Sequence, residues 1–259
     1  MYQEERLISI LDYLKENKRI SVEQICTLFN ISRDTARRDL VKLEEESKIV
    51  RTRGGALLPS IHTEIKNYSH RLNIVSDEKK VIGKKAASLI YPGDRIILDA
   101  STTVQSCAEQ INNTECTIIT NSINQADVLS SNSNINIQLL GGILEKEHRY
   151  VYGSSVIDKL SEYNVDKAFI GVVGISESGL TIAHEEDGAV KRKMIQQAKQ
   201  VIALADNTKL GNTDFFRFAN LQDIDLLITD KTPPQSFREL LDKHHVELLT
   251  AENGDQGDD

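Results

Sequence analysis

The feature that most constrains the fold of this 259-residue chain is a series of short apolar runs, separated by helical patterns, after residue 76. Strands that are apolar along their whole length are typical of a parallel sheet with helices on both faces, because each strand is then buried on two sides. We therefore predict a mainly parallel α/β domain. The apolar runs are "RIILD" (95–99), "CTIIT" (116–120), "INIQLL" (135–140), "KAFIGVV" (167–173), "VIALAD" (201–206) and "DLLITD" (225–230).

The first part of the chain has the pattern of a small helical domain. Apolar residues recur at helical spacing over 3–17, and two more helices are expected after Ser21 and Ser32, whose hydroxyls can cap free backbone N–H groups. About three residues separate these two helices, which is the spacing of a helix-turn-helix. "IVRTRGGALLP" (49–59) predicts two short strands around a Gly-Gly turn. The predicted organisation is a winged helix-turn-helix domain over 1–58, a linker over 59–75, the α/β domain over 76–250 and a disordered tail over 251–259.

Positive charge is concentrated in this small domain, although the whole chain has a formal net charge of −8. The first 56 residues contain 11 Lys and Arg and 10 Asp and Glu, whereas the rest contain 20 and 29. "SRDTARRDL" (32–40) places three arginines at the start of the third predicted helix, and Arg51 and Arg53 precede the Gly-Gly turn. This asymmetry is compatible with an anionic partner for the first domain.

The third predicted helix suits the major groove of DNA. If Ala36 and Leu40 face inward, the arginines lie on other faces, where they can bind guanine or phosphate oxygens. Hydroxyls at the start of this helix, where free N–H groups favour a phosphate, and glycines that allow close backbone approach would add contacts. The predicted DNA-binding residues are Ser21, Ser32, Arg33, Asp34, Thr35, Arg37, Arg38, Arg51, Arg53, Gly54 and Gly55.

The alternative is a solvated helix face on which the arginines pair with Asp34, Asp39 and Glu44. A longer pattern favours DNA binding, because "ISRDTARRDLVKLEEESKIVRTRGGA" (31–56) closely resembles the signature of the DeoR family of bacterial transcription regulators. The resemblance implies a head that binds operator DNA. Two residues depart from the family pattern, with Ala36 where Ile or Val is commoner and Arg53 where His is frequent. The matching residues are Ile31, Ser32, Thr35, Arg37, Arg38, Asp39, Leu40, Leu43, Glu44, Arg51, Gly54, Gly55 and Ala56.

In the second domain, polar residues follow three of the predicted strands, and Gly141-Gly142 follow a fourth. Ligands of parallel sheets bind beyond the carboxyl ends of the strands, and hydroxyls with free N–H groups can hold a phosphate there. A single Ser/Thr cluster at a helix start is more often only a cap, but several in one sheet favour a small, anionic, hydroxyl-rich ligand. The predicted effector-binding residues are Asp99, Ser101, Thr102, Thr103, Thr120, Asn121, Ser122, Gly141, Gly142, Glu185, Asp206 and Lys209.

A helix is also expected around 185–199, with acidic residues at its start and Lys191, Arg192 and Lys193 further along. This order of charges complements the helix dipole and allows i, i+4 pairs, which predicts a solvated helix. The alternative is a helix at the rim of a pocket or at a subunit contact.

The second domain resembles the DeoR family's sensor domain, whose fold is similar to ribose-5-phosphate isomerase. The resemblance implies a phosphorylated sugar or related metabolite as effector, with Ser101, Thr102, Thr103, Asn121 and Lys209 as contacts. Ala100-Ser101 replaces the more usual Ser/Gly-Gly, so a Cβ at position 101 narrows the space for a phosphate. The matching stretches are "ILDASTT", "TNS", "LLGG", "DKAFIGVVGIS", "GLT", "EEDGAVKRKMI", "ALADNTKLG" and "LLITD".

We therefore predict a transcription regulator, a repressor of a carbohydrate-utilisation operon, that binds double-stranded operator DNA under the control of a sugar phosphate. One head offers few base contacts, so a dimer or tetramer is expected. One alternative is an aldose–ketose phosphate isomerase with an appended head, for which Asp99, Asp166, Glu185 and Asp206 are candidate carboxylates. The other alternative is a structural DNA-binding protein with a vestigial pocket.

Several classes of protein are not indicated by the sequence. No apolar run is long enough to span a membrane, and the N-terminus lacks a secretion signal, so a cytoplasmic protein is expected. Three cysteines without a C-x-x-C pair indicate neither a disulfide framework nor a zinc site. No catalytic residue, metal or cofactor is predicted.

Overall fold

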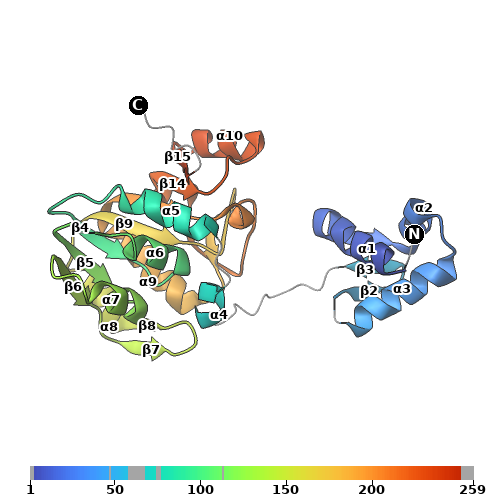
Figure 1. Cartoon of the computed structure of the whole chain (residues 1–259), viewed down its shortest axis with the longest axis horizontal. Coiled ribbons are helices and arrows are strands. Elements are labelled where there is room, and N and C mark those ends of the chain that lie inside the picture. The colour runs from blue at the N-terminus through green and yellow to red at the C-terminus, as the bar shows by residue number, and fades with distance from the viewer. Residues whose placement is uncertain (1–2, 47, 58–67, 74–76, 113, 252–259) are drawn as a thin grey trace. The chain divides into compact units, whose positions relative to one another are not determined.

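The computed structural model of the chain divides into two compact units, Met1–Ile65 and Lys66–Asp259 (Figure 1). Part of the segment predicted as a linker belongs to the second unit, because Tyr68–Asn73 form helix α4 and Tyr68 is buried there. The remainder of the predicted linker, and residues 252–259 of the predicted tail, lie outside the described residues. The structure describes residues 3–46, 48–57, 68–73, 77–112 and 114–251.

The first unit consists of three helices and a small antiparallel sheet, as a winged helix-turn-helix requires. The strand order is β1-β3-β2, so the two strands of the predicted wing pair with each other, and β3 also pairs with β1, a strand that the sequence pattern did not predict. The elements are α1 (Gln3–Asn17), β1 (Arg19–Ser21), α2 (Val22–Phe29), α3 (Arg33–Glu45), β2 (Val50–Thr52) and β3 (Gly55–Leu57).

The two predicted helix starts are confirmed. The Ser21 hydroxyl accepts a hydrogen bond from the Gln24 N–H at 3.1 Å, and the Gln24 side chain accepts one from the Ser21 N–H at 2.8 Å. Ser32 caps α3 by accepting from the Thr35 N–H at 3.2 Å. The inward stripe of α3 packs with α1, α2 and the sheet into one core of Leu7, Ile10, Leu14, Ile20, Ile25, Ala36, Leu40, Leu43, Ile49 and Ala56.

One acidic residue of α3 has a structural role that we did not predict. Asp39 is fully buried, and its Oδ2 accepts a hydrogen bond from Nε of Arg6 on α1 at 2.6 Å. A second bond joins a terminal nitrogen of Arg6 to Oδ1 at 3.1 Å. This pairing raises the pKa of Arg6. Asp39 therefore ties α3 to α1 and does not pair with the arginines of its own helix, contrary to the solvated-face alternative.

The second unit contains a seven-stranded sheet in which all neighbouring strands are parallel, which confirms the predicted class of fold. The strand order is β15-β14-β12-β9-β4-β5-β6. The strands are β4 (Arg95–Leu98), β5 (Cys116–Thr120), β6 (Ile135–Leu139), β9 (Val165–Gly171), β12 (Ala198–Leu204), β14 (Leu226–Thr229) and β15 (Glu247–Thr250).

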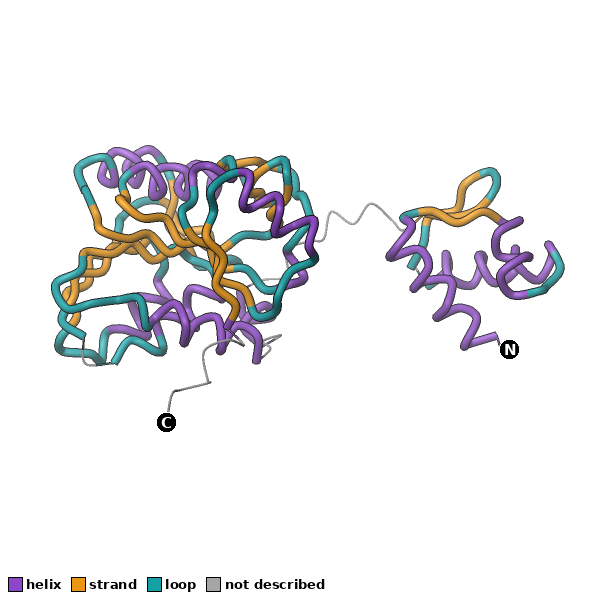
Figure 2. Tube along the Cα trace, turned by 90° about the horizontal axis from the view of Figure 1, so that it is seen from above, coloured by secondary structure: helices purple, strands orange, loops and turns teal. Residues whose placement is uncertain are grey.

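Helices cover both faces of this sheet, and Figure 2 shows the strands running between them. Successive side chains of a strand point to opposite faces, so Ile96 and Leu98 join one hydrophobic core while Ile97 joins the other. Helices α5 and α6 contribute to the first of these cores, and α8, α9 and α10 to the second. The helices are α5 (Asp77–Ala87), α6 (Thr102–Ala108), α7 (Ile123–Leu129), α8 (Ser154–Leu160), α9 (Glu185–Gln196) and α10 (Gln235–Lys243).

Two smaller sheets, which the sequence pattern did not predict, complete the second unit. A hairpin joins β7 to β8, and an antiparallel sheet has the order β10-β11-β13. These strands are only three or four residues long, which leaves little periodicity to detect. Their bounds are β7 (Ile143–Glu145), β8 (Tyr150–Tyr152), β10 (Gly174–Ser176), β11 (Gly179–Ile182) and β13 (Phe216–Ala219).

The strand order of the large sheet reverses between β4 and β9, the position at which sheets of this kind form a ligand-binding crevice. From β4 the chain builds outward through β5 to β6, then crosses to β9 on the other side of β4 and builds outward again through β12 to β15. Parallel sheets bind ligands at such a reversal, beyond the carboxyl ends of the two strands. The residues that follow β4 and β9 are therefore the first place to look for a site.

Candidate functional sites

The first candidate site is the exposed face of α3. Arg33, Arg37 and Arg38 are all exposed. Arg33 lies 3.1 Å from a carboxylate oxygen of Glu23, and Arg37 lies 3.9 Å from Asp34, with every partner more than half exposed. Exposed ion pairs contribute little stability, so these guanidinium groups can exchange their partners for other anions at small cost. The predicted outward orientation of the arginines is confirmed.

The hydroxyls on this face are engaged with the backbone. Ser21 and Ser32 both act as helix caps, and the Ser32 and Thr35 hydroxyl oxygens lie 2.9 Å apart. Their lone pairs therefore serve the starts of α2 and α3, while the side chains stay exposed or half-exposed at the surface. As DNA contacts, Ser21, Ser32, Asp34 and Thr35 stay predictions.

The wing between β2 and β3 exposes two cations. Arg51 lies 3.5 Å from Glu44, and Arg53 is exposed beside Gly54, which has open space around it. Gly55 differs from our prediction, because it is buried and a Cβ there would lie 1.9 Å from the Ile20 carbonyl oxygen. Glycine at this position allows β3 to approach β1, so close approach of a phosphate is not its role.

The second candidate site surrounds a buried ion pair in the crevice between β4 and β9. The Lys191 ammonium, on α9, donates a short hydrogen bond to Oδ2 of Asp99 and another to the Gly171 carbonyl at 3.2 Å. The same Asp99 oxygen accepts from the Gly171 N–H at 2.7 Å. Asp99 and Lys191 are only 1% and 2% exposed at their side chains. Our interpretation of Lys191 as a solvated helix residue was therefore wrong.

The loop after β4 is shaped by close packing against β9. The Ser101 hydroxyl caps α6 by accepting from the Val104 N–H at 3.1 Å. A Cβ at Gly171 would lie 2.1 Å from that hydroxyl, so only glycine fits there. The Ser101 side chain thus fills the space beside Gly171, while the Gln125 amide holds the loop through the Asp99 and Ser101 carbonyl oxygens at 2.6 and 3.1 Å.

Several buried polar side-chain atoms have no hydrogen-bond partner among the described residues. They are Nε of Arg71, Oδ1 of Asn121, Nδ1 of His148 and Oδ1 of Asp187. Such atoms are rare in folded proteins, since each costs free energy unless a partner satisfies it. All four belong to the second unit, and Arg71 and Asp187 influence each other's protonation. Together they indicate a place that a polar ligand would complete.

The electrostatics of these groups have a common cause in burial. Burial raises the pKa of Asp187, and Lys191 opposes that shift. Burial lowers the pKa of Arg71 and brings that of His148 down to about 4, with Arg71 and His184 adding to the second shift. The rings of His148 and His184 lie 4.9 Å apart between centroids. Desolvated charges of both signs thus lie together, so each would gain from a ligand of complementary charge.

Two more cations lie near the loop after β4. The Lys79 ammonium donates to the Thr102 hydroxyl and to the Arg71 carbonyl, both at 3.1 Å. Burial lowers the pKa of Lys79, and Asp206 and Lys209 also act on it. Asp206 itself caps the short helix η1 (Asn207–Lys209) by accepting from the Thr208 N–H at 3.0 Å. The structure thus brings Thr102, Asp206 and Lys209 into the neighbourhood of Lys79.

Other predicted effector residues are used by the fold or lie apart. The Thr120 hydroxyl donates to the Leu98 carbonyl at 2.7 Å, and Ser122 caps α7. Gly142 lies where a Cβ would be 2.6 Å from the Tyr152 carbonyl, whereas Gly141 has open space around it. Glu185 is exposed at the start of α9. Thr103 is buried on α6.

Sequence reasoning missed Tyr68, Arg71, Lys79, His148, Asp187 and Lys191. One signal was present for two of them, because Asp187 and Lys191 share a helical face with Met194 and Ile195 of the core. Charged residues on an apolar face predict burial and hence a partner. Arg71 and Tyr68 gave no such signal, because they lie in the segment of mixed polarity over 59–75, which is predicted to be a linker.

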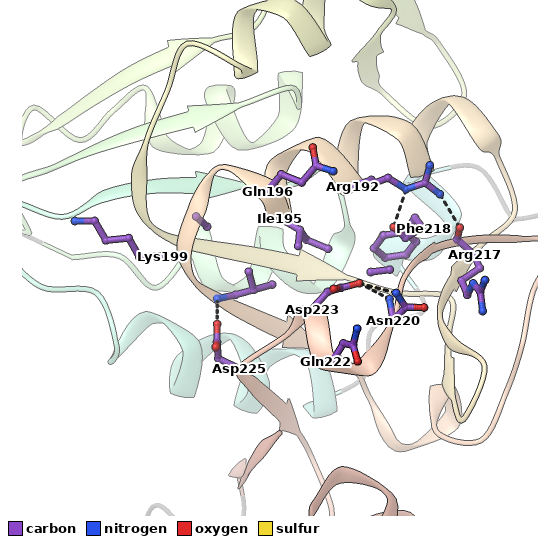
Figure 3. A pocket seen from close by; sticks show the side chains of 13 residues that line it. Arg192, Ile195, Gln196, Lys199, Arg217, Phe218, Asn220, Gln222, Asp223 and Asp225 are labelled. Carbon is purple, nitrogen blue, oxygen red and sulfur yellow. Dashed lines mark hydrogen bonds between the residues drawn. The ribbon is translucent and has the colours of Figure 1, made fainter. Parts of the chain in front are cut away.

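A separate cavity lies at the opposite end of the sheet, near the amino ends of β12 and β14 (Figure 3). Several of its polar groups are paired within the chain. Arg192 donates to the Phe218 and Arg217 carbonyl oxygens at 3.1 and 2.9 Å, and Asp225 accepts from the Val201 N–H at 2.7 Å. This cavity therefore lacks the unsatisfied groups that characterise the crevice between β4 and β9.

Neither a metal site nor a membrane span emerges from the described part of the chain. There, His, Cys, Asp and Glu form no group of three or more with the geometry to hold a metal ion. The described helices are too short or too polar to cross a bilayer.

An exposed arginine face on a winged helix-turn-helix, combined with a buried polar crevice in a separate α/β unit, defines a DNA-binding regulator with its own ligand-sensing domain. Comparisons with known proteins agree. Residues 6–62 match the DeoR-like helix-turn-helix domain, and residues 74–231 match the DeoR C terminal sensor domain. The chain belongs to the DeoR family of transcription regulators, which are not enzymes.

Two of the relatives are similar to this chain over nearly their whole length, and a solved enzyme structure is similar over about half of it. The HTH-type transcriptional repressor GlcR of Bacillus subtilis is 68% identical over 259 residues, all of both chains. The glycerol-3-phosphate regulon repressor of Escherichia coli is 29% identical over 250 residues, covering 96% of this chain and 99% of the other. A ribose 5-phosphate isomerase A from Methanocaldococcus jannaschii is 19% identical, covers 51% of this chain and 53% of its own, and has a TM-score of 0.38. That score is too low to assign a chemistry.

Proposed function

We propose that this protein represses a carbohydrate-utilisation operon and changes its occupancy of operator DNA when a phosphorylated sugar or related metabolite binds its second unit. Two relatives support the proposal, since one is named a transcriptional repressor and another the repressor of a glycerol-3-phosphate regulon. A ligand can shift DNA occupancy only if it binds two states of the protein with different affinity.

On the DNA side, α3 would lie in the major groove with Arg33, Arg37 and Arg38 toward bases and phosphates. Arg51 and Arg53 of the wing would contact the neighbouring backbone. The support is the exposure of these arginines and the weakness of their ion pairs within the chain. The caps Ser21 and Ser32, with Asp34, Thr35 and Gly54, complete the proposed contact surface.

On the effector side, the observation that carries the proposal is the set of unsatisfied buried polar atoms in the second unit, two of which belong to Arg71 and Asp187, close to the Asp99–Lys191 pair. The cations Arg71, Lys79 and Lys209 suit a phosphate, since Arg71 lies close to Asp187 and Asp99, and Lys79 lies close to both Arg71 and Lys209. Sugar hydroxyls can both donate and accept, so they suit the Asn121 and Asp187 oxygens and the His148 nitrogen. Ser101 and Thr102 lie at the start of α6, and Asp206 caps η1.

We also propose that the protein acts as a homo-oligomer, a dimer or tetramer. One winged helix-turn-helix reads only a few base pairs, and a symmetric pair would match a repeated operator half-site. Light scattering behind size exclusion measures the mass directly. A monomer at the concentration that saturates DNA would contradict this part of the proposal.

The first experiment measures binding of the full chain to its own upstream DNA by fluorescence anisotropy across salt concentrations. We expect affinity to fall steeply with salt, because binding releases counterions from phosphates. A scrambled duplex of the same length is the control. Absent binding, or binding that is insensitive to both salt and sequence, would contradict the DNA-binding proposal.

The second experiment tests the effector. Thermal shift and calorimetry with glucose 6-phosphate, fructose 6-phosphate, ribose 5-phosphate and glycerol 3-phosphate should give heat and stabilisation with at least one. Inorganic phosphate and the unphosphorylated sugars are the controls. If none binds, the alternative of a structural DNA-binding protein with a vestigial pocket is favoured.

A further inference from the structure

Helix α4 is held against the rest of the second unit by groups that also border the effector crevice. Tyr68 is 1% exposed, and its hydroxyl donates a short hydrogen bond to Oε1 of Gln105 on α6. Its backbone N–H donates to the Glu147 carbonyl, between β7 and β8, at 2.9 Å. The Lys79 ammonium, on α5, donates hydrogen bonds to the Arg71 carbonyl and to the Thr102 hydroxyl, and so links α4 to α6. Helix α4 is therefore attached to three separate segments of the sensor unit.

Arg71 is half-buried on this helix, close to acidic groups of the second unit. Its guanidinium lies 5.5 Å from the centre of the Tyr68 ring, and its buried Nε has no hydrogen-bond partner. The acidic groups that act on it most are Asp187 and Asp99. A guanidinium with an unused donor in a desolvated site is suited to bind an anion.

Arg71 differs from the other cations of the crevice in its place along the chain. Lys191 lies on α9 and is already bonded to Asp99, while Lys209 lies on η1 next to the sheet. Among these cations Arg71 belongs to the helix nearest in sequence to the winged helix-turn-helix unit (Figure 1). A ligand bound to Arg71 would therefore contact α4, the first described helix of the second unit.

We propose that Arg71 binds the anionic group of the effector, and that α4 thereby couples occupancy of the crevice to the DNA-binding unit. This proposal rests on the proposed function. The anion satisfies the Arg71 guanidinium only while α4 is docked, so the effector binds the docked state more tightly and increases its population. The consequence for DNA depends on that differential affinity, which is a coupling free energy between two sites.

The experiment separates affinity from coupling by working at saturating effector. For each full-length variant, DNA affinity is measured without effector and with a saturating concentration of whichever of the four named phosphates binds the wild type. The ratio of the two dissociation constants is the coupling factor, which for allosteric proteins is about 5 to 150. Effector affinity is measured separately by calorimetry.

Three arginine or lysine to glutamine variants give the comparison. Arg71→Gln should weaken effector binding about tenfold or more, since a charged hydrogen bond is lost, and should also reduce the coupling factor at saturation. Lys209→Gln should weaken effector binding but leave the factor at saturation unchanged, because Lys209 does not lie on α4. Arg238→Gln, on the exposed side of α10, should change neither quantity.

A second variant keeps the proposal testable if Arg71→Gln fails to fold. Tyr68→Phe removes only the hydroxyl that bonds Gln105 and keeps the Arg71 guanidinium, so it should reduce the coupling factor at saturation with a smaller loss of effector affinity than Arg71→Gln causes. Hydrogen exchange of the wild type should also show slower exchange over residues 68–73 when the effector is present. Protection confined to the loops after β4 and β9 would overturn the proposal.

The outcomes distinguish this proposal from the one on which it rests. If no phosphate changes the DNA affinity of the wild type, the proposed effector control fails and the coupling role fails with it. If the wild type responds, but Arg71→Gln and Tyr68→Phe show the wild-type factor at saturation, the proposed function stands and only the role of α4 is overturned.

Discussion

The two units of this protein treat their cations in opposite ways. In the first unit, Arg33 and Arg37 are exposed and paired loosely with neighbours on the same surface. In the second, Lys191 is almost completely buried and Arg71 has a buried nitrogen without a partner. This difference in exposure matches the size of the proposed ligands. A DNA duplex is too large to be enclosed and can contact only exposed cations, whereas a small anion can be surrounded by buried ones.

The two units also differ in whether their stabilising ion pairs lie in the proposed binding sites. The exposed pairs of the first unit contribute little, and its buried pair, Arg6–Asp39, joins α1 to α3 away from the exposed arginines. In the second unit the buried Asp99–Lys191 pair lies in the proposed site itself. Mutations of binding residues should therefore leave the first unit folded but destabilise the second.

The largest expected effect breaks the buried pair of the second unit. Lys191→Met leaves Asp99 buried without its counter-charge, which should lower the free energy of unfolding by about 3 to 5 kcal/mol. Urea denaturation of the full chain measures it. Lys193→Met, two residues further on the same helix, is the matched control, and Asp99→Asn with Lys191→Met should recover part of the loss. If Lys191→Met and Lys193→Met lowered the free energy of unfolding equally, the buried pair would not be the special feature of the second unit.

The next effect concerns the exposed cations. Replacing Arg37 or Arg38 by alanine should weaken operator binding roughly 10- to 100-fold each, as expected for loss of a base or phosphate contact. Each lost phosphate contact should also reduce the salt slope by about one. Anisotropy titrations give both, with Arg238→Ala as the control. Unchanged promoter binding by a folded Arg37→Ala, Arg38→Ala double variant would remove the basis for the DNA-binding face.

A pH experiment tests the burial of charge in the crevice. The pKa of His148 is lowered from 6.5 to about 4, so as pH falls the unfolded chain binds this proton before the folded one does. The free energy of unfolding is therefore unaffected by His148 above the ordinary pKa of histidine, and it decreases as pH falls from there toward 4.

The readout is the difference in unfolding free energy between the wild type and His148→Gln. It should shrink by roughly 1 to 3 kcal/mol between pH 7.5 and 4.5. Asp187, whose pKa burial raises, acts in the opposite sense but is common to both proteins, so subtraction removes it. A difference that does not vary with pH would show that His148 titrates as an exposed residue does.

The smallest effect compares two helix caps. Ser32→Ala in α3 and Ser101→Ala in α6 should each cost about 1 kcal/mol of stability, because each leaves one backbone N–H unsatisfied. Their functional effects should separate, with operator affinity reduced by the first and effector affinity by the second. Reversed or identical functional effects would contradict the division of labour between the units.

The sequence predicted the elements that local pattern determines. The apolar strands β4, β5 and β14 and the caps at Ser21 and Ser32 were found because hydrophobic runs and capping residues act over a few neighbouring positions. The candidate site was predicted only in part. Asp99 and Asn121 were expected from their places after strands, but Arg71 and His148 lie on other segments with no pattern of their own.

The sequence by itself determined the two kinds of unit, the helix that exposes the arginines and the edge of the sheet where polar loops gather. Only the tertiary structure decided which charges are buried, that Lys191 pairs with Asp99, that Gly55 and Gly171 permit close packing, and that α4 borders the crevice. The physical reason is that secondary structure and capping depend on adjacent residues. Desolvation and pairing of charges depend instead on segments far apart in the chain, which only the packed sheet brings together.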